Sequence, residues 1–129
     1  MATTKLRQQI EAFATHPEAL TCVTGITISF EDRRVDRVPS TDTVALEYLA
    51  RYRGMEAHPS SVVVRREALV GPIGLVDEEI PGSYGEDFDW ILRAAAAGPI
   101  AVVEQPLVEV AWGQSLFSER WATIIEAID

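Results

Sequence analysis

The sequence has one cysteine and two histidines among its 129 residues. A single thiol, Cys22, cannot form an internal disulfide or a metal site built from several thiolates. Because such usage fits a reducing compartment, we expect a cytoplasmic protein in which Cys22 is a small buried residue of a strand. His16 and His58 have no nucleophile at catalytic spacing. The glycine-rich phosphate-binding, zinc-protease and serine-hydrolase motifs are also absent from the sequence.

Basic residues are scarce in the second half of the chain. Residues 1–65 hold eight acidic and eight basic side chains, whereas residues 66–129 hold twelve acidic and three basic ones, so the net charge of −9 arises in the second half. A nucleic-acid-binding protein needs the opposite sign, so we expect no nucleic-acid partner. The apolar stretch over residues 91–103 is interrupted by Arg93, Gly98 and Pro99, and the first residues lack the pattern of a signal peptide. We therefore expect no membrane span.

Helical and strand-like patterns alternate along the chain, and we expect residues 1–129 to form a single domain. With 47% hydrophobic and 24% charged residues, the composition is that of a globular protein. The alternation predicts an α/β fold with a mixed sheet flanked by helices. The predicted helices cover residues 4–14 (with Leu6, Ile10 and Phe13 on one face), 41–53, 86–97 and 117–128, with a helical turn at 66–70. The predicted strands cover residues 20–30, 60–65, 100–103 and 107–111, with a turn or irregular hairpin at 31–39 and a loop at 71–85.

The stretch GEDFDWILR at residues 85–93 joins a glycine and an acidic pair to a helical pattern. At about 100° per residue, it has two faces. Phe88, Ile91, Leu92 and Ala95 form the buried face, and Glu86, Asp89, Trp90 and Arg93 lie opposite. On that face, Arg93 could pair with Asp89 or Glu86. Acids in a first helical turn usually cap the helix or complement its dipole. The functional alternative is a carboxylate at the edge of a cleft that accepts a proton from a hydroxyl nucleophile.

Four segments of the sequence resemble, in order and in spacing, the middle of a family 2 glycosyltransferase of the GT-A type. Residues 59–69 end in the RREAL turn, residues 73–77 read IGLVD, residues 85–94 contain the acidic pair and an arginine, and residues 103–108 read VEQPLV. The resemblance covers most of the chain and is weaker before His58. It implies a partial GT-A-like mixed sheet flanked by helices.

The resemblance also implies a mechanism. In this family, the second acid of the pair is the usual general base, here Asp87. It would deprotonate an acceptor hydroxyl, which then attacks the anomeric carbon of a nucleotide-sugar with inversion. Glu86 would contact the acceptor or orient Asp87. Trp90, Trp112 and His58 are candidate acceptor-binding residues. For Trp90 and Trp112 the alternative is packing, and for His58 it is an ordinary loop position.

The sequence departs from the family pattern in its first half. The family's opening strand, nucleotide-binding acids and metal-binding D-x-D motif should precede the first helix, and Asp87-Phe88-Asp89 lies in the wrong place to be that motif. The histidine that often follows the P-L-V strand is also absent. We therefore expect no metal site in this chain alone. A divalent metal (Mn or Mg) and the nucleotide-sugar are expected only with the missing donor half, so the fragment alone should be inactive.

Two other hypotheses remain open. A partial sheet exposes a strand edge, and such edges pair with other chains. The chain could therefore be a non-catalytic interaction module or remnant that self-associates as a homo-oligomer. A third hypothesis is an acidic module that binds a divalent cation within residues 77–89.

Overall fold

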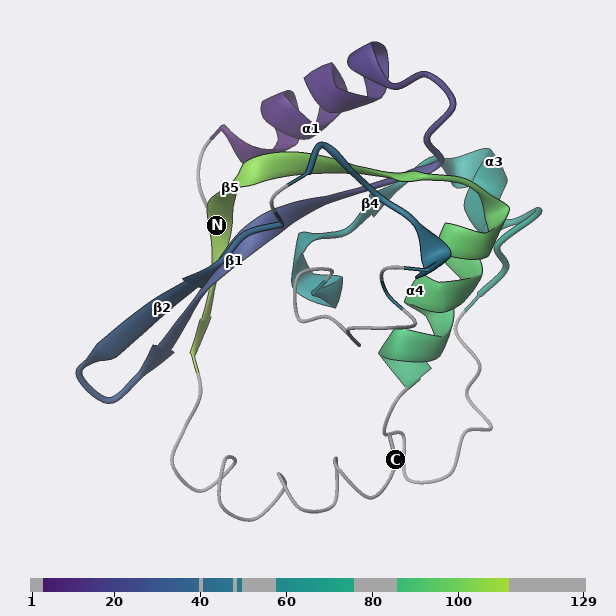
Figure 1. The fold of residues 1–129 in the computed structure, drawn as a ribbon. Helices are drawn as coiled ribbons and strands as arrows, with labels where there is room; N and C mark the ends of the chain where they lie inside the picture. The colour runs from purple at the N-terminus through teal and green to yellow at the C-terminus, as the bar shows by residue number, and fades with distance from the viewer. Residues whose placement is uncertain (1–3, 40, 48, 50–57, 76–85, 112–129) are drawn as a thin grey trace.

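The structure is a computed structural model, and it describes residues 4–39, 41–47, 49, 58–75 and 86–111. Figure 1 shows the arrangement of the helices and strands. In chain order the elements are α1 (Lys5–Thr15), β1 (Thr21–Phe30), β2 (Arg33–Arg37), β3 (Thr43–Val44), the 3-10 turn η2 (Pro59–Ser61), β4 (Val63–Val64), α3 (Arg66–Leu69), α4 (Glu86–Ala97) and β5 (Ile100–Ala111).

The five strands form one mixed sheet around the central pair β1 and β5, which run parallel. β2 and β4 pair antiparallel with the other edge of β1, β2 along its second half and β4 at its start. β3 pairs antiparallel with the first residues of β5. The predicted α/β class with a mixed sheet flanked by helices is therefore confirmed.

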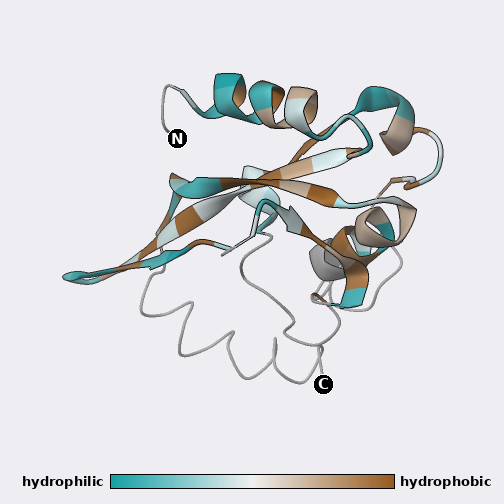
Figure 2. Ribbon diagram, turned by 45° about the horizontal axis from the view of Figure 1, so that its top comes forward, coloured by the Kyte–Doolittle hydropathy of each residue, from teal (hydrophilic) through white to brown (hydrophobic). Residues whose placement is uncertain are grey.

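Helices cover both faces of this sheet. Neighbouring residues of a strand point to opposite faces, so alternate residues of β1 and β5 pack against different helices. On one face, Val23 of β1 and Ile100 and Val102 of β5 pack in the same cluster as α4. On the other, Cys22 packs with Ala101 and with side chains of α1. Figure 2 shows the hydrophobic residues concentrated on the central strands and α4. α1 and α4 lie on opposite sides of the sheet (Figure 1).

Several predicted elements agree closely with the structure. α4 covers residues 86–97 as predicted, α1 ends one residue later than predicted, and the predicted hairpin at 31–39 contains β2. The strand over 60–65 is shorter than predicted, since η2 occupies its first residues and only Val63–Val64 is β-structure. The predicted helix over 117–128 lies outside the described residues.

Two predictions about the strands and helices are wrong. The helix predicted over 41–53 does not begin at 41, because Thr43 and Val44 form β3 against β5, and helical geometry starts only at Leu46. The two strands predicted at 100–103 and 107–111 are one strand, β5. β5 continues because Pro106 lies opposite Gly25, where the β1–β5 register shifts. At such an irregularity, the missing N–H of proline costs little.

Gly25 allows the segment after β2 and the strand β5 to approach β1 closely. A Cβ atom at this position would lie 2.6 Å from Cγ2 of Val38 and 3.0 Å from the carbonyl oxygen of Gln105. Because real Cβ atoms essentially never come within 3.0 Å of other atoms, a side chain here would push Val38 and β5 away from β1.

Candidate functional site

The candidate site is built on the N-terminal turn of α4. The helix begins at Glu86, so Glu86 and Asp87 are its first two residues, where the helix dipole stabilises negative charge. The structure describes their backbone, and their side chains lie outside the described part. Trp112, the second candidate aromatic, also lies outside the described residues.

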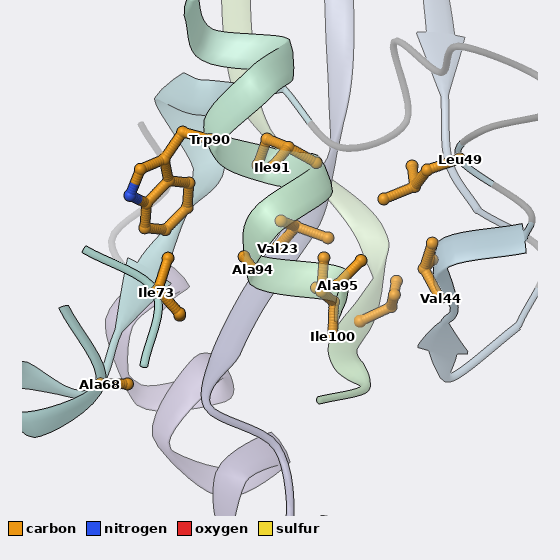
Figure 3. Packing of buried hydrophobic residues seen from close by; sticks show 11 residues of the cluster. Val23, Val44, Leu49, Ala68, Ile73, Trp90, Ile91, Ala94, Ala95 and Ile100 are labelled. Carbon is orange, nitrogen blue, oxygen red and sulfur yellow. The ribbon is translucent and has the colours of Figure 1, made fainter. Parts of the chain in front are cut away.

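Trp90 lies in the core, which corrects its predicted place on the exposed face of α4. Its side chain is 7% exposed and belongs to the same cluster as Ile73 and Ala94. Figure 3 shows the indole ring beside Ile73. The indole Nε1 donates a hydrogen bond to the carbonyl oxygen of Gly74 at 2.8 Å. The structure thus gives Trp90 a packing role, and its small exposed fraction leaves little surface for an acceptor.

Arg93 binds the same loop from the next part of α4. Its Nη1 donates to the carbonyl oxygen of Ile73 at 2.8 Å, and its Nη2 donates to that of Leu75 at 2.7 Å. Its Nε also pairs with Asp89 at 3.2 Å, the contact expected from their helical spacing. Gly74 has a φ of +83°, and a Cβ there would lie 3.2 Å from Nη1 of Arg93. Three hydrogen bonds from α4 side chains, one from Trp90 and two from Arg93, therefore depend on the course of residues 73–75.

No pattern in the sequence indicates these contacts with main-chain carbonyl groups. Trp90 and Arg93 are three positions apart on α4, and both reach residues 73–75, which precede the helix. The helical spacing predicted only a local pair of Arg93 with Asp89 or Glu86. Every residue has a main-chain carbonyl group, so hydrogen bonds to these groups do not change the composition or the periodicity of a sequence. The contacts of Trp90 and Arg93 with residues 73–75 can therefore be found only from the structure.

His58 is the N-cap of η2, the turn that leads into β4. Its Nδ1 accepts a hydrogen bond from the backbone N–H of Ser60 at 3.1 Å, and its carbonyl oxygen accepts one from the hydroxyl of Ser61 at 2.9 Å. The structure therefore places His58 at the start of an edge strand in a local capping role. Its predicted part in acceptor binding stays a prediction.

The described residues contain no group of three histidine, cysteine, aspartate or glutamate side chains that could hold a metal ion. Most of the acidic stretch at 77–89, on which the cation-binding hypothesis rests, lies outside the described residues. The described residues thus offer no donor set for Mn or Mg.

A second cluster of polar side chains lies between α1 and the sheet, and it includes the titratable groups of Lys5 and Cys22. Lys5 is 5% exposed and donates from Nζ to Oε1 of Gln9 at 2.6 Å. Gln9 is fully buried, and its Nε2 donates to the carbonyl oxygens of Cys22 at 3.1 Å and Ser61 at 2.8 Å. Gln9 therefore ties α1 to β1 and to the turn before β4. Burial lowers the pKa of the Lys5 ammonium below its ordinary value of 10.5, because water no longer solvates the charge.

This arrangement turns the apolar side chains of α1 outward. Leu6 is 58% exposed and Ile10 is 60% exposed, while Lys5 and Gln9 face the sheet. Of the three apolar residues predicted to share one face, only Phe13 packs partly against the cluster around Cys22. The hydrogen bonds of Gln9 to two main-chain carbonyls explain why a polar residue occupies the buried side.

Cys22 is buried as predicted, with none of its surface exposed, and burial raises the pKa of its thiol to about 11. We expect iodoacetamide at pH 8 to leave the native protein unlabelled and to label it fully in 6 M urea, since the thiolate is the reactive form. Mass spectrometry measures the labelling. Equal rates in the native and unfolded protein would contradict this expectation.

The same shift has a consequence for stability at high pH. Between pH 9 and 11 the unfolded chain loses the thiol proton while the folded chain keeps it, so the thiol's contribution to stability is lost as the pH rises through this window. Comparing the pH dependence of unfolding in the parent protein and in Cys22→Ala measures this contribution together with the effect of Cys22 on the pKa of Lys5.

Among the described residues, no helix combines the length and apolar character needed to cross a membrane. Compared with known proteins, the chain matches no protein-family model, no curated protein and no solved structure.

Proposed function

We propose that this chain provides the acceptor side of a glycosyltransferase, with Asp87 as the general base. The observation that supports the proposal is the start of α4 at Glu86, which puts the acidic pair in the first turn of the helix, as the family resemblance requires. Three of the resembling segments coincide with described elements: residues 59–69 with β4 and α3, residues 85–94 with α4, and residues 103–108 with β5.

In the proposed reaction, the carboxylate of Asp87 takes the proton of an acceptor hydroxyl. The oxygen forms a bond to the anomeric carbon of the sugar, and the bond from that carbon to the nucleoside diphosphate breaks, with inversion. Glu86 contacts the acceptor or orients Asp87. A general base of this kind contributes about 10²–10⁴ in rate.

The contacts of α4 supply the rigidity that such a base needs. Trp90 and Arg93 fix residues 73–75 against the helix through hydrogen bonds of 2.7–2.8 Å. A catalytic group must be held in place by its surroundings, because a small displacement lowers the rate strongly. We therefore assign Arg93 and Trp90 as positioning residues for the first turn of α4.

The resemblance assigns nucleotide-sugar binding and the divalent metal to residues other than these, in a longer chain or in another subunit. The metal would stabilise the charge on the leaving diphosphate. In this chain, the described residues offer no ligands for it.

Two titrations test the proposal on the chain as it is. Calorimetry with nucleotide-sugars, with and without Mn²⁺, should detect no tight binding, whereas simple glycosides should shift the backbone NMR signals of α4 near Glu86. Asp87→Asn should reduce these shifts, and Asp89→Asn, which makes the same charge change two residues further along α4, should preserve them. Tight nucleotide-sugar binding would contradict the division into two halves. Glycosides that leave α4 unchanged would contradict an acceptor site there.

A further inference from the structure

β2 is an edge strand whose five residues are all exposed. It pairs with β1 on one side, and among the described strands it is the outermost one at that edge of the sheet. Figure 1 shows the β1–β2 hairpin projecting from the body of the protein, and Figure 2 shows that its tip is hydrophilic. Along the outer side of an edge strand, alternate N–H and C=O groups have no partner strand and can pair with another chain.

The charges of β2 differ between its two faces. On one face the charged groups already have partners within the sheet, because Arg34 pairs with Glu109 at 3.1 Å and Asp36 accepts a hydrogen bond from Thr27 at 2.7 Å. Arg33 and Arg37 lie on the opposite face, on either side of Val35, since residues two apart share a face. In the described part of the chain, neither guanidinium forms an ion pair. This face therefore presents two positive charges about 13 Å apart.

A second copy of the chain is a poor partner for this edge. If two β2 strands paired antiparallel with Val35 opposite Val35, each Arg33 would face the Arg37 of the other copy. On the other face Arg34 would meet Asp36, but these two side chains already have partners within the sheet. In a parallel pair in register, every arginine would face itself. Like charges directly opposite each other destabilise a strand pair, so the expected self-association does not suit β2.

We propose that β2 binds an acidic, extended peptide segment of a partner protein by strand addition. The segment carries two acidic residues four positions apart, which meet Arg33 and Arg37, and an apolar residue between them, which covers Val35. Val35 is 47% exposed and gives the segment an apolar contact. Main-chain hydrogen bonds supply affinity in this mode of recognition, and alternate side chains supply specificity. The proposal does not depend on glycosyl transfer.

A peptide fits this surface better than a nucleic acid does. The chain carries a net charge of −9, which repels a polyanion at long range. A short acidic peptide carries few negative charges. Its main-chain N–H and C=O groups can also pair with those of β2, which a sugar-phosphate backbone cannot do.

Fluorescence anisotropy with the labelled peptide Gly-Glu-Thr-Val-Thr-Glu-Gly tests the proposal. We expect saturable binding that falls at least about tenfold in the double variant Arg33→Glu/Arg37→Glu. The matched control is Arg7→Glu/Arg66→Glu, which makes the same charge change at two exposed arginines of α1 and α3 and should bind like the parent protein. A peptide with proline at both threonine positions keeps the charges and removes two N–H groups, and we expect it to bind weakly.

Several outcomes would overturn this proposal. Absence of binding at millimolar peptide, or an equal loss in the control variant, would remove the specific role of β2. Unchanged affinity of the proline peptide would indicate charge attraction without strand pairing. Tighter binding of a single-stranded oligonucleotide would assign the surface to nucleic acid. A dimer that dissociates in Arg33→Glu/Arg37→Glu would assign it to a second copy.

Discussion

Replacing Gln9 with leucine is expected to lower the free energy of unfolding by about 3–5 kcal/mol. The substitution removes the donor to the carbonyl oxygens of Cys22 and Ser61, and it removes Oε1, which accepts the hydrogen bond of the Lys5 ammonium. All three groups would stay buried without these bonds. Urea denaturation followed by circular dichroism measures the loss.

Two further variants make this expectation specific. Gln8→Leu changes a neighbouring glutamine whose side chain donates to the hydroxyl of Thr4, the N-cap of α1, and should cost less than about 1 kcal/mol. The double variant Lys5→Met/Gln9→Leu removes the stranded charge and should recover much of the loss, because an apolar pair can replace a buried polar one. A cost below about 1 kcal/mol for Gln9→Leu would show that water or a rearranged side chain satisfies the buried groups.

Asp87→Asn is expected to lower the rate of glycosyl transfer by about 10²–10⁴ while donor affinity stays nearly unchanged. The amide keeps the size of the side chain but cannot accept the acceptor's proton. The measurement needs an active enzyme that contains this chain together with a donor-binding half. Initial rates give the loss in kcat, and calorimetry with the nucleotide-sugar gives the donor affinity.

Asp89→Asn is the matched control for this variant. It makes the same change of charge two residues along α4, where Asp89 pairs with Arg93 in the described structure. Since that pair is partly exposed, its loss should affect transfer only weakly. Transfer that survives in Asp87→Asn, or that is lost equally in Asp89→Asn, would contradict the assignment of Asp87 as the base.

Local patterns predicted the elements whose interactions are themselves local. α4 was predicted at its observed bounds because its helical period is regular, and β1 was predicted from its alternating pattern. β3 was missed because Thr43 and Val44 become a strand only by pairing with β5, which lies far along the chain. Pairing of that kind overrides local helical propensity.

The same contrast holds at the candidate site. The sequence predicted the acidic pair at the start of a helix and a pairing of Arg93 with Asp89 or Glu86, and the structure shows the pair with Asp89. The prediction for Trp90 was wrong. The pattern of a single helix does not show that residues 73–75 pack against the face on which Trp90 lies. The packing of Lys5 and Gln9 under α1 was likewise invisible, since their partners lie on β1 and η2.

The parallel pairing of β1 with β5 also has a consequence for biosynthesis. β1 is synthesised and leaves the ribosome well before its central neighbour β5 does, because β5 lies much further along the chain. Until then, one side of β1 has no strand to complete it, apart from what other chains offer. A nascent chain of this kind is a natural client for chaperones, and its folding should be slow, as is typical of domains whose contacts join distant parts of the sequence.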